Sequence, residues 1–298
     1  MLKLVLIPVA GFIFARAKKL PDNVITLFSD ILLMICYPAM VLEVFAQRDM
    51  WGLWRESISV VIVCGAAAVT LFLLGKFFLF RNHGQEPLLT FMLGSSCVTY
   101  IGIPVSEIML GPYGLKVAIL YGLVTDIFCW YLFYPFFLVG KKRVSLSRLL
   151  LNPCIVCMLA GLIFSLSGAA MPAPAAEALS ALSACVSPLA LLILGFTLAN
   201  KDLGLIVRNL WALRFSACKV LLIPLLCLPL IMTLTDPVTA LALLTLIACP
   251  TALLSVIWAR GWGWDVSLAT DCFINSTLLF FLIALQLIYM LKNIVMKL

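Results

Sequence analysis

Long apolar segments alternate with short polar connections along the whole chain. Each segment holds roughly 20 mainly apolar residues, the length that an α-helix needs to cross about 30 Å of hydrocarbon. Apolar and polar residues do not alternate within the segments, so helices are favoured over barrel strands. This pattern predicts ten spans. They are expected at Leu2–Ala15, Val24–Phe45, Ile58–Phe80, Leu88–Leu110, Leu115–Val139, Leu149–Leu166, Ala178–Ala199, Asn209–Leu234, Val238–Ala259 and Val266–Leu291.

The composition supports an all-α polytopic membrane protein. Apolar residues make up 64% of the 298 positions, charged residues make up 11%, and the mean hydropathy is +1.19. An ordinary soluble domain has about 25% charged residues. The net charge of +7 comes from short Lys and Arg clusters between apolar segments, without a continuous basic face. We therefore interpret it as topogenic charge and expect no nucleic-acid partner.

The loop charges predict an orientation. On alternate sides of the ten spans, one set of loops holds eleven Lys and Arg residues and the other holds six. The richer side should be cytoplasmic, which places both termini outside the cytoplasm.

Two halves of the chain resemble each other at an offset of about 150 residues. The segment 10–14 (AGFIF) matches 160–164 (AGLIF), and the prolines at 21 and 38 match those at 172 and 188. Because each half has five spans, the second half enters the membrane with opposite orientation, as in many secondary transporters with inverted repeats. We predict a first repeat at 1–140, a cytoplasmic basic loop at 141–148 and a second repeat at 149–298.

Two spans at corresponding places are interrupted by polar residues, glycine and proline. The interruptions lie at 94–104 in span four and at 248–255 in span nine. Proline removes a backbone donor, and the freed carbonyls find no partner in lipid, so such breaks indicate a cavity or buried site. Amides at half-helix N-termini suit an anion, and we expect a carboxylate-bearing substrate where the two broken helices cross. The residues expected to bind it are Ser95, Ser96, Cys97, Thr99, Tyr100, Gly102, Pro104, Pro250, Thr251 and Ser255.

Ionisable residues inside spans are a second functional signal, because each is costly unless it faces a partner or a cavity. Asp126 and Asp271 follow the prolines of the two breaks at similar spacing, and either could carry a coupling proton. Asn275 lies one turn after Asp271 as a polar partner. Lys219 could balance an acid, attract an anionic substrate, or extend to the membrane surface. A structural hydrogen bond, or a side chain that extends to the membrane surface, is the competing interpretation of Asp271 and of Asp126.

These features together resemble the auxin efflux carrier family, which includes bacterial carriers of malonate-like dicarboxylates and plant auxin exporters. The resemblance spans essentially the whole chain. It rests on the order and spacing of short motifs: Tyr100–Pro104, Gly111–Leu115, Asn152–Pro153, Pro188–Leu191 with Gly195, Lys219 with Pro224, and Cys249–Ala252 with Ala259. The resemblance implies crossed helices four and nine, as in bile-acid symporters and sodium–proton antiporters, between a scaffold and a moving bundle.

One departure from the family pattern concerns the substrate. Family members often have Asn and Gly shortly before the aromatic residue, and the Asn helps to bind the substrate carboxylate. Here Cys97 and Thr99 stand at those positions. Either the ligand differs, or Ser95, Ser96 or Thr99 takes over this role.

The sequence therefore predicts a secondary transporter of a small organic anion, a carboxylate or auxin-like molecule, that works by alternating access in a bacterial-type inner membrane. Its expected partners are the anion, H⁺ or Na⁺, the lipid bilayer and, as one assembly, a second copy of the chain. No cofactor is expected. A sodium-coupled bile-acid-type symporter is the alternative within this class. An intramembrane aspartic protease is disfavoured, because no glycine stands two residues before Asp126, so we expect no enzyme activity.

Overall fold

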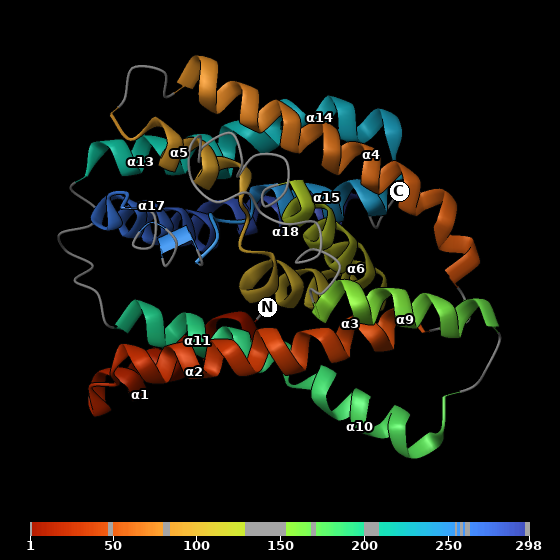
Figure 1. Ribbon diagram of the computed structural model, residues 1–298. Coiled ribbons are helices and arrows are strands. Elements are labelled where there is room, and N and C mark those ends of the chain that lie inside the picture. The colour runs from red at the N-terminus through yellow and green to blue at the C-terminus, as the bar shows by residue number, and fades with distance from the viewer. Residues whose placement is uncertain are drawn as a thin grey trace. The chain divides into compact units, whose positions relative to one another are not determined.

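The computed structural model describes residues 2–46, 50–79, 84–128, 153–167, 171–199, 209–253, 255–256, 259 and 263–295. All regular elements of these residues are helices (Figure 1). The predicted basic loop at 141–148 lies outside the described residues.

The chain divides into two compact units, each built from both halves of the sequence. The first unit contains 1–57 and 144–201, and the second contains 58–143 and 202–298. The helices of the first unit are α1 (Leu2–Lys18), α2 (Asp22–Ile31), α3 (Tyr37–Phe45), α9 (Pro153–Ser167), α10 (Ala173–Ala184) and α11 (Val186–Ala199). The two repeats predicted from the sequence, 1–140 and 149–298, do not coincide with these units and stay a prediction.

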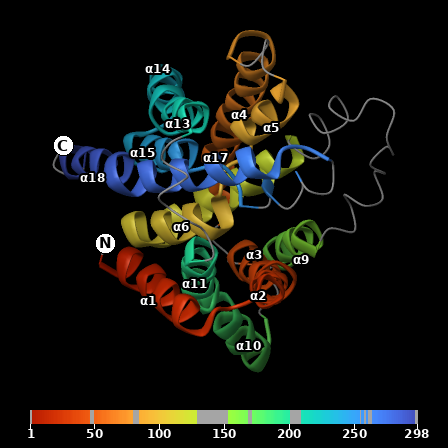
Figure 2. The same cartoon turned by 90° about the vertical axis from the view of Figure 1, so that its left-hand side faces the viewer.

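Glycines pack the helices of the first unit closely, and Figure 2 shows α1 beside α11. A Cβ atom added to Gly11 of α1 would lie 2.8 Å from the Leu192 carbonyl oxygen of α11. A Cβ atom added to Gly161 of α9 would lie 2.8 Å from Cβ of Phe45 in α3. These two glycines are the ones matched in the sequence halves, and each allows the first helix of its half to contact the second span of the other half.

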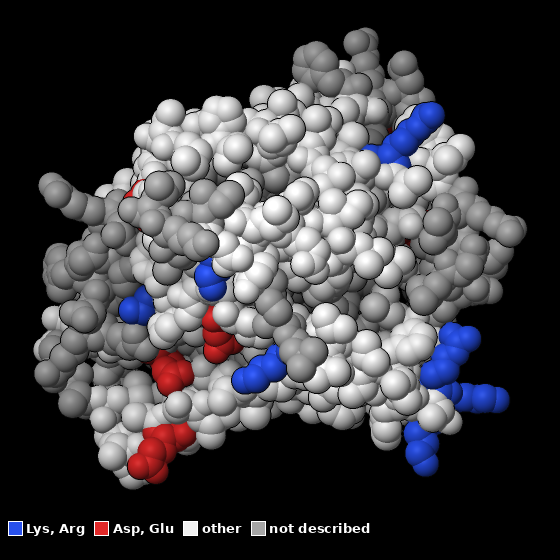
Figure 3. All heavy atoms as spheres, turned by 180° about the vertical axis from the view of Figure 1, so that it is seen from behind, with Lys and Arg blue, Asp and Glu red and all other residues white. Residues whose placement is uncertain are grey.

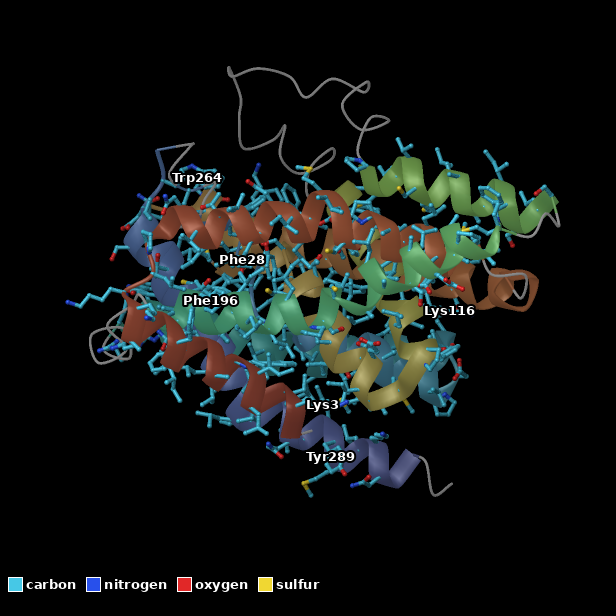
Figure 4. All side chains as sticks on the ribbon, turned by 90° about the horizontal axis from the view of Figure 1, so that it is seen from below. Lys3, Phe28, Lys116, Phe196, Trp264 and Tyr289 are labelled. Atoms are coloured by element: carbon cyan, nitrogen blue, oxygen red, sulfur yellow. The ribbon has the colours of Figure 1, made fainter. Side chains whose placement is uncertain are left out.

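Aromatic and basic side chains complete this packing. The Phe28 and Phe196 rings meet edge to face with their centroids 6.0 Å apart (Figure 4). The Arg16 guanidinium donates a hydrogen bond of 3.3 Å to the carbonyl of Ala199, the last residue of α11. A cation at that place satisfies a carbonyl that the helix itself leaves without a donor.

The second unit contains the remaining helices, and its boundary with the first falls inside α4, between residues 57 and 58. Its helices are α4 (Met50–Leu74), α5 (Glu86–Gly94), α6 (Ile103–Ile127), α13 (Leu210–Ala217), α14 (Ile223–Leu234), α15 (Pro237–Ala248), α17 (Val266–Leu279) and α18 (Leu285–Val295). Within α6, Gly111 has φ of +63°, and the helix changes direction there. This turn separates predicted spans four and five. Glycine is suited to the positive φ of the turn because it has no Cβ.

Short π-helical segments interrupt several spans. They lie at Leu32–Cys36, Gly75–Leu79, Val98–Gly102, Cys218–Leu222 and Phe280–Ala284. Three of them end two residues before a proline: Pro38, Pro104 and Pro224.

Proline accounts for these three segments. Its ring clashes with the carbonyl four residues earlier and it donates no hydrogen bond. The residue before each proline instead bonds five residues back, as Ile103 does to the Val98 carbonyl and Ile223 to the Cys218 carbonyl. The wider π turn makes room for the ring while the backbone stays helical, and such bulges are frequent at functional sites.

The surface of the described helices is suited to lipid. Six stretches are long and apolar enough to cross a membrane, with Pro153–Ser167 and Pro237–Ala248 as shorter apolar helices. Large apolar side chains face outward on them, such as Leu282 at 72% exposure. Uncharged residues cover most of the described surface in the view of Figure 3. The protein is therefore an integral multi-pass membrane protein, and the count of ten spans stays a prediction.

Candidate functional site

The two predicted interruptions are present as breaks between helices in the second unit. Helix α5 ends at Gly94, Ser95 is extended with φ −92° and ψ 122°, and the π segment begins at Val98. Helix α15 ends at Ala248, and Cys249 leaves the helical region with ψ 144°. Each break exposes backbone groups that a continuous helix would have paired.

The two breaks pair with each other as short antiparallel segments. Ser96 and Thr251 form an antiparallel bridge. The Cys97 amide donates to the Pro250 carbonyl at 2.8 Å, and the Ala252 amide donates to the Ser95 carbonyl at 3.3 Å. The backbone groups freed by one break are thus satisfied by the other.

Side chains reinforce the pairing. The hydroxyls of Ser95 and Ser255 lie 3.0 Å apart, and the Thr251 hydroxyl donates to the Met92 carbonyl at 2.8 Å. The Thr251 amide lies 3.4 Å from the hydroxyl oxygen of Ser276, a fully buried residue of α17. Ser95, Thr251 and Ser255 are polar residues in otherwise apolar spans, which is the signal that identified the breaks in the sequence.

Lys219 connects a third element to the break of α5. It lies in the π segment before Pro224, and none of its surface is exposed. Its Nζ donates to the Leu93 carbonyl at 2.8 Å and to the Ser96 hydroxyl at 2.9 Å. The side chain therefore does not extend to the membrane surface, because a carbonyl and a hydroxyl solvate its ammonium group inside the protein.

The carbonyl end of α5 is closed by donors from three residues, Ser95, Thr251 and Lys219. The Phe91 carbonyl accepts from the Ser95 amide at 3.0 Å, the Met92 carbonyl accepts from Thr251, and the Leu93 carbonyl accepts from Lys219. A helix leaves its last carbonyls without intrahelical donors, and inside a membrane water does not replace them. Thr251 and Lys219, from two other spans, supply the hydrogen-bond donors that lipid cannot provide.

The predicted substrate-binding residues differ in accessibility. Ser96 and Thr99 are partly exposed. The others are buried: Ser95, Cys97, Tyr100, Gly102, Pro104, Pro250, Thr251 and Ser255. Among the predicted binding residues, the side chains of Ser96 and Thr99 are therefore the accessible ones.

Close packing holds the segment after the break in place. A Cβ atom on Gly102 would lie 3.0 Å from a methyl carbon of Leu246 in α15. One turn later, the hydroxyl of fully buried Ser106 has no hydrogen-bond partner among the described residues. The end of the π segment at Gly102 thus packs closely against α15. The first turn of α6 buries the Ser106 hydroxyl without a hydrogen-bond partner among the described residues.

The two predicted acids lie in different environments. Asp126, in the last turn of α6, is exposed and makes no side-chain hydrogen bond or ion pair within the described ranges. Asp271 is partly buried and accepts a 2.8 Å hydrogen bond from the Asn209 side-chain amide. Asn209 caps α13 through its side-chain oxygen, so this bond ties the start of α13 to α17. The Asp271 carboxylate thus makes the structural bond that the sequence left as the competing interpretation.

Two residues of this region were missed by the sequence reasoning. Tyr121 of α6 is buried and its hydroxyl interacts with the Ser96 side chain. Ser276 bonds the Thr251 amide, as described above. Ser276 follows Asn275 directly, and a run of three polar residues at 275–277 in an apolar span was a signal for it; a lone tyrosine carries none.

Comparison with known proteins gives one family. The model of the membrane transport protein family, of auxin efflux carrier type, matches residues 1–145 and 138–289. No curated protein matches the chain significantly.

Proposed function

Because the chain belongs to the auxin efflux carrier-type membrane transport family, we propose that it is a secondary transporter of a small organic anion that binds at the paired breaks of α5 and α15. The observation that carries this proposal is the buried Lys219 ammonium, which lies 2.9 Å from the partly exposed Ser96 hydroxyl. A cation and a hydroxyl at a break in the membrane favour a carboxylate.

The chemistry of Ser96 supports an anionic ligand. Its oxygen accepts a hydrogen bond from Lys219, and its own proton would be shared between the Tyr121 hydroxyl beside it and a bound carboxylate oxygen. Thr99 is the second accessible hydroxyl, three residues on in the π segment. Amides at the start of the following helix add partial positive charge. Together these groups would replace part of the water that the anion loses.

Alternating access is the transport mode that we propose for this site. The protein would lie in a bacterial-type inner membrane with both termini outside the cytoplasm, and a proton or sodium ion is the candidate coupling ion. Asp126 remains a candidate proton carrier because it is a membrane acid with an exposed side chain.

Ligand binding can be tested by thermal unfolding of the purified protein against mono- and dicarboxylates at several pH values. A ligand at 100 times its Kd stabilises the native state by about 2.7 kcal/mol. We expect at least one carboxylate to raise the unfolding midpoint, and uncharged amides of the same acids to have no effect. If amides and acids stabilise equally, the site does not select anions.

Transport can be tested with proline variants. Replacing Pro104 or Pro250 with Ala restores a backbone donor at the break and should abolish transport in liposomes while leaving membrane insertion intact. Pro229→Ala is the matched control, because Pro229 lies inside α14 with an exposed side chain. Normal transport by inserted Pro104→Ala and Pro250→Ala proteins would refute a role for the breaks.

A further inference from the structure

The carbonyl end of α5 is a place where a membrane protein can hold a cation. Its carbonyls carry the partial negative charge of the helix C-terminus, and no water is available in the hydrocarbon to neutralise it. Half-helix C-termini and unwound carbonyls at the midplane of transporters coordinate Na⁺ or H⁺. The identity of the cation at this end of α5 therefore bears on ion coupling.

In this protein a side-chain ammonium stands at that end. Lys219 Nζ lies 2.8 Å from the Leu93 carbonyl oxygen and 2.9 Å from the Ser96 hydroxyl oxygen. The Leu93 oxygen belongs to the last turn of α5, and the Ser96 oxygen belongs to the break that follows it. The ammonium contacts the kind of oxygen ligands that a hard cation would take there.

The backbone fixes the lysine in this position. The π segment Cys218–Leu222 sits two residues before Pro224, and its neighbours Val220 and Ile223 are buried at 1% and 2% exposure. Because the backbone of this π segment is fixed by buried neighbours and by Pro224, the Lys219 side chain places its ammonium group at one position. Burying a charge is costly, and the two short hydrogen bonds of the ammonium offset part of that cost.

We propose that Lys219 is a tethered cation that occupies the cation position at the carbonyl end of α5, so that the protein needs no sodium ion there. This proposal deepens the proposed function, and it rests on it in taking the paired breaks as the transport site. It bears on the two transporter classes left open by the sequence, because a sodium-coupled symporter with Lys219 at this position would have to bind its ion elsewhere.

The first arm of the test uses the wild-type protein and no carboxylate. The unfolding midpoint of the purified full-length chain is measured while choline is exchanged for Na⁺ at constant ionic strength. We expect no shift. A rise of the midpoint with Na⁺ would overturn the proposal.

The second arm empties the position. Lys219→Ala removes three carbons and the ammonium, and leaves a cavity that fits propylammonium. We expect a lower midpoint that propylammonium or Na⁺ raises again by roughly 2–4 °C or more. Lys219→Met loses the same charge but fills the cavity, and should not be rescued. Lys292→Ala, which removes a lysine that donates to the Met109 carbonyl, controls for general effects of the ions.

Each outcome bears on the proposal. If neither cation stabilises Lys219→Ala beyond Lys292→Ala, the position does not select a cation and the proposal fails. If Lys219→Ala cannot be recovered even with propylammonium, the wild-type arm decides. Because no carboxylate is present in either arm, a failed carboxylate screen would remove the proposed substrate class without affecting the result for Lys219.

Discussion

Replacing Thr251 with Val removes one hydroxyl from the pairing of the breaks and changes little in shape. The hydroxyl donates to the Met92 carbonyl at 2.8 Å, and the residue is fully buried. Side-chain hydrogen bonds measured inside membrane proteins contribute about 0.6 kcal/mol on average and about 1.7 at most. A carbonyl left buried without a donor costs about 1–3 kcal/mol.

The Met92 carbonyl keeps one weak partner after this change, the Ser95 hydroxyl at 3.4 Å. We therefore expect Thr251→Val to destabilise the protein by about 1–2 kcal/mol, between the two ranges. For a chain of this size that is a fall of roughly 2–6 °C in the unfolding midpoint.

Thermal unfolding of the purified protein measures this, with Thr245→Val as the matched control. Thr245 is equally buried in α15, but its hydroxyl donates at 2.7 Å to the Leu241 carbonyl of its own helix. That carbonyl has a helical amide partner without the hydroxyl, so its loss should cost little. Equal midpoints for Thr251→Val and Thr245→Val would show that the bond of the Thr251 hydroxyl to the Met92 carbonyl contributes nothing beyond burial.

Two further predictions concern packing and the acid of α17. Gly195→Ala places a Cβ atom 2.2 Å from the Pro8 carbonyl oxygen. We expect this overpacking to lower the free energy of unfolding by about 1–3 kcal/mol, measured by thermal unfolding. Gly84→Ala is the control, because its Cβ atom meets open space and the variant should unfold like the wild type. Asp271→Ala removes the acceptor for Asn209 and should lower stability by about 1 kcal/mol; if transport is lost while the midpoint is unchanged, Asp271 acts in coupling and not in structure.

The sequence predicted the location of the breaks well because their causes are local. Pro104 and Pro250 remove backbone donors, and polar residues beside them mark the position in an otherwise apolar span. The turn at Gly111 was likewise expected between spans four and five, since a glycine followed by Pro112 interrupts the apolar pattern. Local chemistry of this kind is visible in a single sequence.

The partners of the polar groups could not be predicted, because they come from distant parts of the chain. Lys219 bonds a carbonyl 126 residues away, and periodicity carries no information on such a pair. The sequence therefore could not distinguish between the three roles considered for Lys219: balancing an acid, attracting an anion, or extending to the membrane surface. Helix α10 begins at Ala173, whereas the sequence predicted a start at Ala178. The cause is simpler here: Pro172 and Pro174 suit the first turn of a helix, but by composition they look like a loop.

The pairing of the breaks also sets an order for making this protein. Thr251 is synthesised 159 residues after Met92, the carbonyl that it caps, which at 5–20 residues per second takes roughly 8–30 s. During that interval the polar break of α5 is already in or near the membrane without its partners. The break of α5 is therefore unpaired until this late step, and we expect variants that weaken the pairing to be recovered in smaller amounts than the wild type.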